Sequence, residues 1–226
     1  MPTHRQISPA AASRTTEAPP LRRGQARERI LDAAMQVIRQ KGYAATTVDD
    51  LCAAAGVTKG AFFHHFASKE DVGVAAARHW SAVTGALFAG AAYHEPTDPL
   101  DRLFAYLDFR AALIQGTTAE FTCLAGTMVQ ETFATAPAIR DACCDSIASH
   151  AATLEADFTA AIAAYGAPPG VTAASFAMHT QAVLQGAFIL AKAKDDPAIA
   201  FESIEHLRRY LALTFGREPP GVRAQR

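Results

Sequence analysis

The sequence predicts an all-α protein of about nine helices, and three observations support this fold class. Apolar residues recur at three- and four-residue spacings along most of the chain, as they do on one face of an α-helix. Helix-start signals precede these stretches, including aspartate followed by proline at Asp98–Pro99 and Asp196–Pro197. Alternating apolar and polar runs, which are typical of strands, are not evident. With half of its 226 residues hydrophobic, the chain is long enough to bury a core without a disulfide or a metal.

The first helix is expected to follow a basic N-terminal stretch. Residues 1–23 are rich in Pro, Ala, Ser, Thr and Arg, so we expect a disordered basic arm that lacks the apolar centre of a secretion signal. The next apolar residues share one helical face: Ile30, Ala33, Ala34, Val37 and Ile38. Gly42 should end this helix, because glycine favours the left-handed C-terminal conformation and the preceding Lys41 suits the last turn.

Two short helices separated by a tight turn are predicted next. The first covers residues 48–55, with Thr46 or Thr47 as its cap and Gly56 at its end. Thr58 can cap the second helix. A helix, a four-residue turn and another helix describe a helix-turn-helix, whose second helix enters the major groove of DNA.

The remainder of the chain is helical by the same criteria. Ser68 begins a longer helix, and Asp98–Pro99 begins one with an apolar face. A single helix is predicted from Pro137 to about Gly166, followed by a proline-rich loop. The last two helices are expected over residues 172–194 and 197–215.

Charge divides the chain into two parts. Residues 1–69 carry ten Lys/Arg and five Asp/Glu, and residues 70–226 carry eleven and seventeen, so the net charge of −1 conceals a basic end and an acidic remainder. A basic end suits a polyanionic partner such as DNA. The four cysteines show no CxxC spacing, which favours a reducing, cytoplasmic location. No apolar run is long enough to predict a membrane-spanning helix.

Residues 41–71, KGYAATTVDDLCAAAGVTKGAFFHHFASKED, resemble the N-terminal domain of the TetR/AcrR (tetracycline-repressor-like) regulators. The resemblance is specific, because Gly-Tyr, Thr-Thr, Ala-Gly-Val, Lys-Gly, an aromatic-His-His-Phe run and Ser-Lys-Glu occur in order at the family's spacing. It extends back along the first helix to about Arg27. The resemblance implies a three-helix DNA-binding domain joined through a long fourth helix to a helical ligand-binding and dimerisation domain.

The same resemblance implies which residues contact DNA. Seven positions match DNA contacts of the family: Thr47, Thr58, Lys59, Gly60, Phe63, His64 and Lys69. Phe63 stands where the family usually has tyrosine, so one expected hydrogen bond to phosphate is missing. Phe62 and Phe66, four residues apart, are expected to pack inward and fix the recognition helix, which leaves Phe63 and His64 to face the duplex.

A weaker resemblance covers residues 122–131, TCLAGTMVQE, together with residues 137–140. The pattern is similar to the Gly-Cys-Leu-x-Gly…Gln-Glu…Pro-x-x-Arg signature of one branch of these regulators. Some members of that branch sense electrophiles or oxidants through the cysteine, and others bind small organic ligands. Cys123 is therefore either a sensing thiol, which needs a lowered pKa and access, or an inert small core residue.

Two further sets of residues are candidates for the ligand pocket and the dimer interface. Met and Phe suit an adaptable apolar pocket, although they suit a closed core equally well. The pocket candidates are Phe104, Leu107, Cys123, Met128, Phe133, Phe158 and Phe176. The last two helices have long amphipathic faces that should pair with their copies as a four-helix bundle. The interface candidates are Ala182, Gly186, Ile189, Ile204, Leu207 and Leu211.

The predicted function is that of a homodimeric repressor, which binds a palindromic double-stranded DNA operator and is released by a small, mainly apolar or electrophilic effector. The alternatives are a ligand-independent architectural or adaptor protein and a thiol-dependent enzyme. No catalytic residue, metal or cofactor is expected, because GxSxG, Walker, GxGxxG and HExxH motifs are absent and adjacent histidines on a helix diverge. Four segments are expected: the arm 1–23, a DNA-binding domain 24–70, a ligand-binding and dimerisation domain 71–216, and a tail 217–226.

Overall fold

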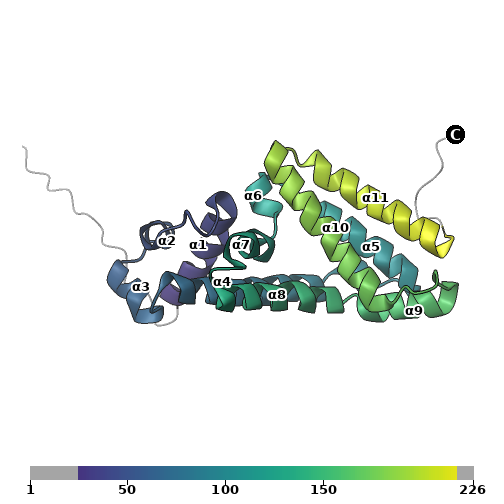
Figure 1. Cartoon of the computed structure of the whole chain (residues 1–226), viewed down its shortest axis with the longest axis horizontal. Helices are drawn as coiled ribbons and strands as arrows, with labels where there is room; N and C mark the ends of the chain where they lie inside the picture. The colour runs from purple at the N-terminus through teal and green to yellow at the C-terminus, as the bar shows by residue number, and fades with distance from the viewer. Residues whose placement is uncertain (1–24, 218–226) are drawn as a thin grey trace, which may run out of the picture.

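The protein is all-helical over residues 25–217, the part of the chain that this computed structural model describes (Figure 1). Within that range eleven α-helices and one short 3-10 helix form and no strand does, which confirms the predicted fold class. The elements are α1 Gln25–Lys41, α2 Val48–Ala55, α3 Lys59–His65, α4 Lys69–Ala89, η1 Ala92–His94, α5 Pro99–Ala112, α6 Thr118–Phe121, α7 Leu124–Thr132, α8 Pro137–Ala152, α9 Glu155–Tyr165, α10 Ala173–Lys194 and α11 Ala198–Phe215. The predicted arm, residues 1–23, and residues 218–226 of the predicted tail lie outside the described residues.

Capping residues mark where the first helices begin and end, at the positions that the sequence predicted. Thr47 caps α2 by accepting a hydrogen bond from the backbone N–H of Asp50 at 3.1 Å, while the Asp50 carboxylate accepts one from the backbone N–H of Thr47 at 2.7 Å. Gly56 ends α2 in the left-handed region, with φ of 61°. Thr58 caps α3 by accepting a hydrogen bond from the backbone N–H of Ala61 at 3.2 Å. These caps satisfy backbone groups that the helices leave unpaired, and so they fix the turn between α2 and α3.

One hydrophobic core joins the three N-terminal helices to α4, α7 and α8. Buried residues of α1–α3, such as Ile30, Leu51 and Phe62, belong to the same cluster as Leu124 of α7 and Ile139 of α8. The cluster therefore extends across the predicted domain boundary after residue 70. Helices α1–α3 cannot separate from α7 and α8 without exposing apolar surface to water.

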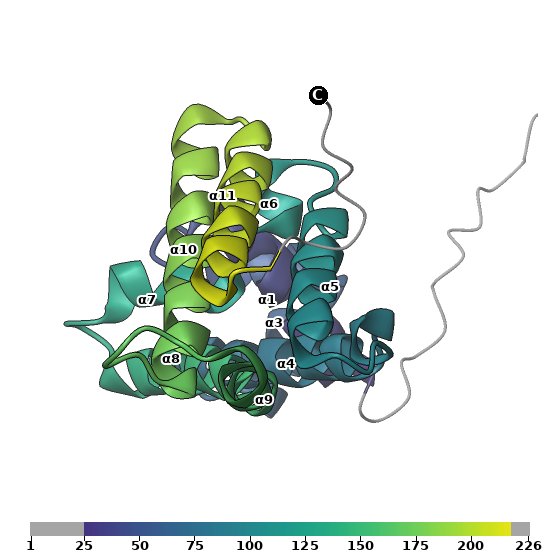
Figure 2. The same ribbon diagram turned by 90° about the vertical axis from the view of Figure 1, so that its right-hand side faces the viewer.

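A second core lies at the other end of the molecule, between α5, α9, α10 and α11 (Figures 1 and 2). Phe158 and Phe176 stack at its centre, with their rings 5.2 Å apart and 10° from parallel. Helices α10 and α11 run in opposite directions side by side and cover this core. The two cores are linked by α4 and α8, which pack along each other in the middle of the molecule.

The prediction of one helix from Pro137 to Gly166 is wrong. The chain breaks after Ala152 and resumes as α9 at Glu155. At the break, the backbone N–H groups of Thr153 and Leu154 donate to carbonyls three residues earlier, at 3.3 and 3.0 Å, so the α-helical pattern ends there. Leu154 is buried in the second core. It is apolar because the turn between α8 and α9 packs there, and not because one helix continues through it. Helices α6 and α7 lie in a segment for which periodicity predicted no helix.

Gly73 lies at a close contact of α4 with its neighbours. A Cβ atom at this position would lie 2.7 Å from Ile139 Cδ1 and 2.9 Å from Tyr43 Cε2. Ile139 is fully buried, so its side chain has little free space to move into. Gly85, on the same helix, has no atom within 4 Å of its equivalent Cβ position.

These two glycines of α4 should respond oppositely to alanine. We expect Gly73→Ala to destabilise the protein by about 1–3 kcal/mol, because the added methyl overpacks the contact between α4 and α8. Gly85→Ala should raise the free energy of unfolding by up to about 1 kcal/mol, because alanine favours a helix interior more than glycine does. Urea unfolding followed by circular dichroism, at one protein concentration, compares the two variants. Equal midpoints would contradict the close packing assigned to Gly73.

Candidate functional site

Helix α3 presents a mixed polar and aromatic face at one end of the molecule (Figure 1). Phe62 and Phe66 are buried against α1 and α2, as predicted from their four-residue spacing. Lys59, Phe63 and His64 are exposed, and Phe63 is 55% accessible to solvent. The helix is thus held by its buried aromatics, while Lys59, Phe63 and His64 remain accessible on its outer side.

The three residues at the start of α3 have different contacts: Thr58, Lys59 and Gly60. The Thr58 hydroxyl caps the helix. The Lys59 ammonium lies 2.8 Å from Asp49 Oδ1, and this hydrogen bond and charge raise the pKa of the lysine. Both side chains are more than 60% exposed, so the pair contributes little to stability and can open. Gly60 would have only the Thr58 hydroxyl, at 3.8 Å, near an added Cβ, so internal packing does not require glycine there.

The two predicted phosphate-binding residues outside α3 already have partners in the chain. The Thr47 hydroxyl donates to Asp50 Oδ2 at 2.6 Å as part of the α2 cap. Lys69 is half-buried at the start of α4, where its ammonium donates to the carbonyl of Ala44 at 3.0 Å and lies 4.4 Å from the centre of the Tyr43 ring. Burial lowers the pKa of Lys69. An ammonium has three donors, so this hydrogen bond does not exhaust Lys69.

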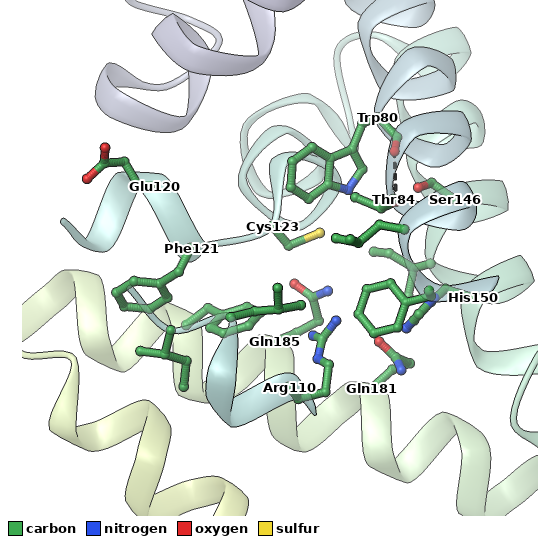
Figure 3. A pocket seen from close by; sticks show the side chains of 16 residues that line it. Trp80, Thr84, Arg110, Glu120, Phe121, Cys123, Ser146, His150, Gln181 and Gln185 are labelled. Atoms are coloured by element: carbon green, nitrogen blue, oxygen red, sulfur yellow. Dashed lines mark hydrogen bonds between the residues drawn. The ribbon is translucent and has the colours of Figure 1, made fainter. Parts of the chain in front are cut away.

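A partly enclosed cavity of about 170 Å³ lies between α4, α5, α6, α8 and α10 (Figure 3). Sixteen residues line it: Trp80, Thr84, Leu87, Phe88, Arg110, Leu113, Ile114, Glu120, Phe121, Cys123, Ser146, Ile147, His150, Gln181, Gln185 and Phe188. The lining is mostly apolar, with a few polar groups, which is the usual character of a small-molecule site.

Only one of the seven predicted pocket residues, Cys123, lines this cavity. Four of the others are buried in the second core: Phe104, Leu107, Phe158 and Phe176. Met128 is buried in the first core, and Phe133, at the end of α7, is 62% exposed. Most of the predicted residues are large residues on regular apolar faces, and those faces pack helix against helix. The cavity forms where the facing side chains are polar or irregularly spaced. The spacing of apolar residues therefore could not predict which residues line it.

Cys123 differs from the other three cysteines in its surroundings. It is half-exposed at the cavity and caps α7, where its Sγ accepts a hydrogen bond from the backbone N–H of Gly126 at 3.4 Å. Cys143 is fully buried, and burial raises its pKa to about 12. Burial also raises the pKa of Cys52. Cys144 is exposed and does not line the cavity.

The polar wall of the cavity contains a half-buried histidine. His150 Nε2 lies 3.0 Å from the hydroxyl of Tyr106, which also accepts a hydrogen bond from Gln181 Nε2 at 3.3 Å. Burial, reinforced by the positive charge of Arg110, lowers the pKa of His150 to about 4. The imidazole is therefore neutral at physiological pH.

The cavity wall is connected directly to α1. Arg39 of α1 places its guanidinium 5.1 Å from the Trp80 ring, and its Nη1 donates to the carbonyl of Glu120 at 2.5 Å. Lys192 of α10 donates to the carbonyl of Arg39 at 3.2 Å and to Thr127 Oγ1 at 2.8 Å. Neither Arg39 nor Lys192 was a predicted site residue, because their contacts join segments that are distant in the chain.

A second connection joins α7 to the loop between α1 and α2. Glu131 Oε2 accepts a hydrogen bond from the backbone N–H of Ala44 at 2.6 Å. The backbone carbonyl of Ala44 in turn accepts the hydrogen bond from the Lys69 ammonium. Glu131 belongs to the Gln-Glu part of the weaker sequence signature, which gave no role for it.

Three of the six predicted interface residues are buried within their own chain. Ile204, Leu207 and Leu211 of α11 pack in the second core and are at most 2% exposed, so they cannot contact a partner. Ala182 and Ile189 of α10 are exposed, and Gly186 is half-exposed. The spacing of apolar residues identified the apolar face of α11, but it could not show that this face packs on the core of its own chain. The exposed large apolar residues of α10 and α11 are Met178, Ile189, Leu190, Phe201, Tyr210 and Leu213.

Residues 25–217 offer neither a cluster of metal ligands nor a membrane-spanning helix. Within that range no group of three His, Cys, Asp or Glu side chains is arranged to hold a metal ion. None of the helices there has the length and apolarity needed to cross a membrane.

Two family sequence profiles match the chain. The profile described as bacterial regulatory proteins of the tetR family matches residues 30–76, and one described as a tetracyclin repressor-like C-terminal domain matches residues 99–207. The first match contains α2 and α3, and the second contains most of the residues around the cavity.

Curated relatives resemble the chain over limited stretches. The transcriptional regulator AcuR of Cereibacter sphaeroides is 28% identical over 106 residues, which are 47% of this chain and 48% of AcuR. The repressor DhaR of Mycobacterium sp. strain GP1 is 43% identical over 47 residues, 21% of this chain and 24% of DhaR. The uncharacterised regulator YerO of Bacillus subtilis is 37% identical over 54 residues, 24% of this chain and 19% of YerO. The matches thus span from a fifth to a half of the relatives' lengths.

Solved structures share the fold over most of the chain. A TetR-family regulator from Agrobacterium tumefaciens has a TM-score of 0.72 at 22% identity and covers 84% of this chain and 97% of its own. A TetR regulator from Chloroflexus aurantiacus has the same TM-score at 26% identity, over 84% and 96%. Escherichia coli NemR, in its reduced form, has a TM-score of 0.68 at 22% identity, over 81% and 96%. The chain therefore belongs to the TetR family of transcriptional regulators, which bind DNA and typically act as repressors.

Proposed function

We propose that the chain is a ligand-responsive repressor that binds a palindromic operator as a homodimer and is released from it by a small effector. The observation that carries this proposal is the arrangement of α3: its aromatics Phe62 and Phe66 are buried, and Lys59, Gly60, Phe63 and His64 face outward. The cavity favours a ligand-responsive regulator over a ligand-independent adaptor, because an adaptor needs no partly enclosed apolar space.

The exposed face of α3 suits the major groove. Lys59 can leave Asp49 for a base edge or a phosphate, and the absence of a side chain at Gly60 lets the backbone approach the duplex. Phe63 offers an apolar contact to a thymine methyl group. Thr47 and Lys69 lie at the edge of this surface, where both would contact phosphate, and Thr58 and His64 complete the contacts that we propose.

Dimerisation is proposed to use the outer faces of α10 and α11. Ala182, Gly186 and Ile189 contribute small and apolar surface there, together with the exposed residues Met178 and Leu213. Two copies would form a four-helix bundle and hold their α3 helices about 34–36 Å apart, one turn of DNA. Because its operator is chromosomal DNA, this repressor would act in the cytoplasm.

The effector would act on DNA binding through the walls of the cavity. Trp80 lies in the cavity wall and under Arg39 of α1, so a ligand that displaces the indole also displaces a contact of the DNA-binding helices. Such an effector must bind more tightly to the conformer with low operator affinity, and the operator must weaken effector binding by the same factor. In this proposal residues 24–70 supply the DNA contacts and residues 71–216 supply the cavity and the dimer contacts.

Replacing Lys59 tests the assignment of α3. Lys59→Ala should weaken binding to DNA from upstream of the protein's own gene by about 1–3 kcal/mol per half-site, because one charged contact to the groove is lost. Lys194→Ala, which removes an exposed lysine at the far end of α10, is the matched control and should bind as the wild type does. Gel shift at fixed salt measures both affinities. Equal affinity of the two variants would show that α3 does not read DNA.

Cys123 is the thiol through which an electrophilic effector would act. N-ethylmaleimide should release operator from the wild type and from Cys144→Ser, whose exposed thiol lies outside the cavity, but not from Cys123→Ser. Fluorescence anisotropy of labelled operator follows the release, and mass spectrometry counts the modified thiols. Release from Cys123→Ser to the same extent as from the wild type would assign the effect to another residue.

A further inference from the structure

Arg110 is a cation that faces the cavity without an anionic partner. Within residues 25–217 it forms no ion pair and no hydrogen bond, and its guanidinium lies near three aromatic rings, at 5.2 Å from the ring centre of Phe88, 5.6 Å from that of Phe188 and 5.9 Å from that of Tyr106. A guanidinium has five N–H donors in a planar fork that matches a carboxylate. All five donors of Arg110 are therefore available to a molecule in the cavity.

Neutral polar groups of the cavity lie beside Arg110. Figure 3 shows Arg110 together with Gln181, Gln185 and His150, on the side of the cavity away from Glu120. Gln181 and His150 share the hydroxyl of Tyr106, whereas the Gln185 amide forms no hydrogen bond within the described residues. His150 is neutral because burial depresses its pKa. Arg110 is consequently the one fully charged cation among the lining residues, accompanied by amides that can donate hydrogen bonds.

The lining carboxylate, Glu120, does not neutralise Arg110. Its Oε2 accepts hydrogen bonds from the backbone N–H and the hydroxyl of Thr117, at 2.6 and 2.9 Å, in the cap of α6. These hydrogen bonds lower its pKa and hold it as a satisfied anion at the opposite end of the cavity. The Arg110 end thus keeps a positive charge that the protein leaves uncompensated.

The rest of the wall sets the size and polarity of the occupant. Trp80, Leu87, Leu113, Phe121 and Ile147 give an apolar surface around a volume of about 170 Å³. A cavity of about 150 Å³ holds benzene, so the space suits a ring or a short chain with one polar group. A phosphate ester carries about two charges and would meet one cation only. A single carboxylate matches the single guanidinium.

We infer that the effector is a small apolar carboxylate, held by a paired hydrogen bond from Arg110 to its carboxylate oxygens, with its apolar body against Trp80. This inference rests on the proposed ligand-responsive function and specifies the chemical class of the ligand. Ion pairing between Arg110 and the ligand is stronger in this partly enclosed space than at the open surface, and Gln185 supplies a further donor.

The test compares acids with their uncharged amides. Trp80 is the only tryptophan of the chain and lines the cavity, so its fluorescence reports occupancy directly. The full-length protein is titrated with benzoate, phenylacetate and hexanoate, and with benzamide, phenylacetamide and hexanamide. We expect at least one acid to bind at least about tenfold more tightly than its amide, as a charge-assisted hydrogen bond provides. Arg110→Met should remove this preference, Arg110→Lys should retain part of it, and Arg140→Met, a control at an exposed arginine outside the cavity, should not change it.

Three results would overturn the inference: equal binding of every acid and its amide, a preference that survives in Arg110→Met, or no response to any acid at millimolar concentration. The measurement needs no DNA, so it stands apart from the proposed repressor function. Operator binding that is normal but indifferent to a bound acid would refute the repression mechanism while leaving the carboxylate site intact. Absence of operator binding would refute the function alone.

Discussion

The structure depends on one constraint, the apolar core that α1–α3 share with α4, α7 and α8. Phe62 of the recognition helix and Leu124 and Ile139 of the C-terminal region belong to one buried cluster. Because protein interiors are close-packed, a displacement of α7 or α8 cannot be absorbed by empty space and must shift its neighbours. The orientation of α3 is therefore set jointly by its own aromatics and by helices that wall the cavity.

Polar contacts hold the helices around this shared core in specific positions relative to one another. Arg39 joins α1 to the cavity wall through Trp80 and the carbonyl of Glu120, and Lys192 ties the same arginine to α10. Burial lowers the pKa of both Arg39 and Lys192, and each nevertheless has hydrogen-bond partners that compensate part of that cost. An effector that moves Trp80 acts on these bonds first, because they lie between the cavity and α1.

The sequence was sufficient for the fold class, because helix caps and apolar spacing are local signals. Thr47, Gly56, Thr58 and Asp98 end or begin helices as predicted. The sequence could not show which surface each apolar face packs against. The apolar face of α11 packs on its own chain, and the Phe residues predicted for the pocket fill a core. Arg110 gave no signal in the sequence, because an arginine at the end of a helix ordinarily faces solvent and its lack of a partner becomes evident only in three dimensions.

The most direct test of this coupling is the emission of Trp80 with and without operator DNA. Since Trp80 contacts Arg39 and is the only tryptophan, operator binding should change its emission in the wild type. Arg39→Met should bind the operator with little or no such change, and unrelated DNA of the same length should leave the wild-type spectrum as it is. Identical spectra of the free and the operator-saturated wild type would contradict the coupling between the cavity and the DNA-binding helices.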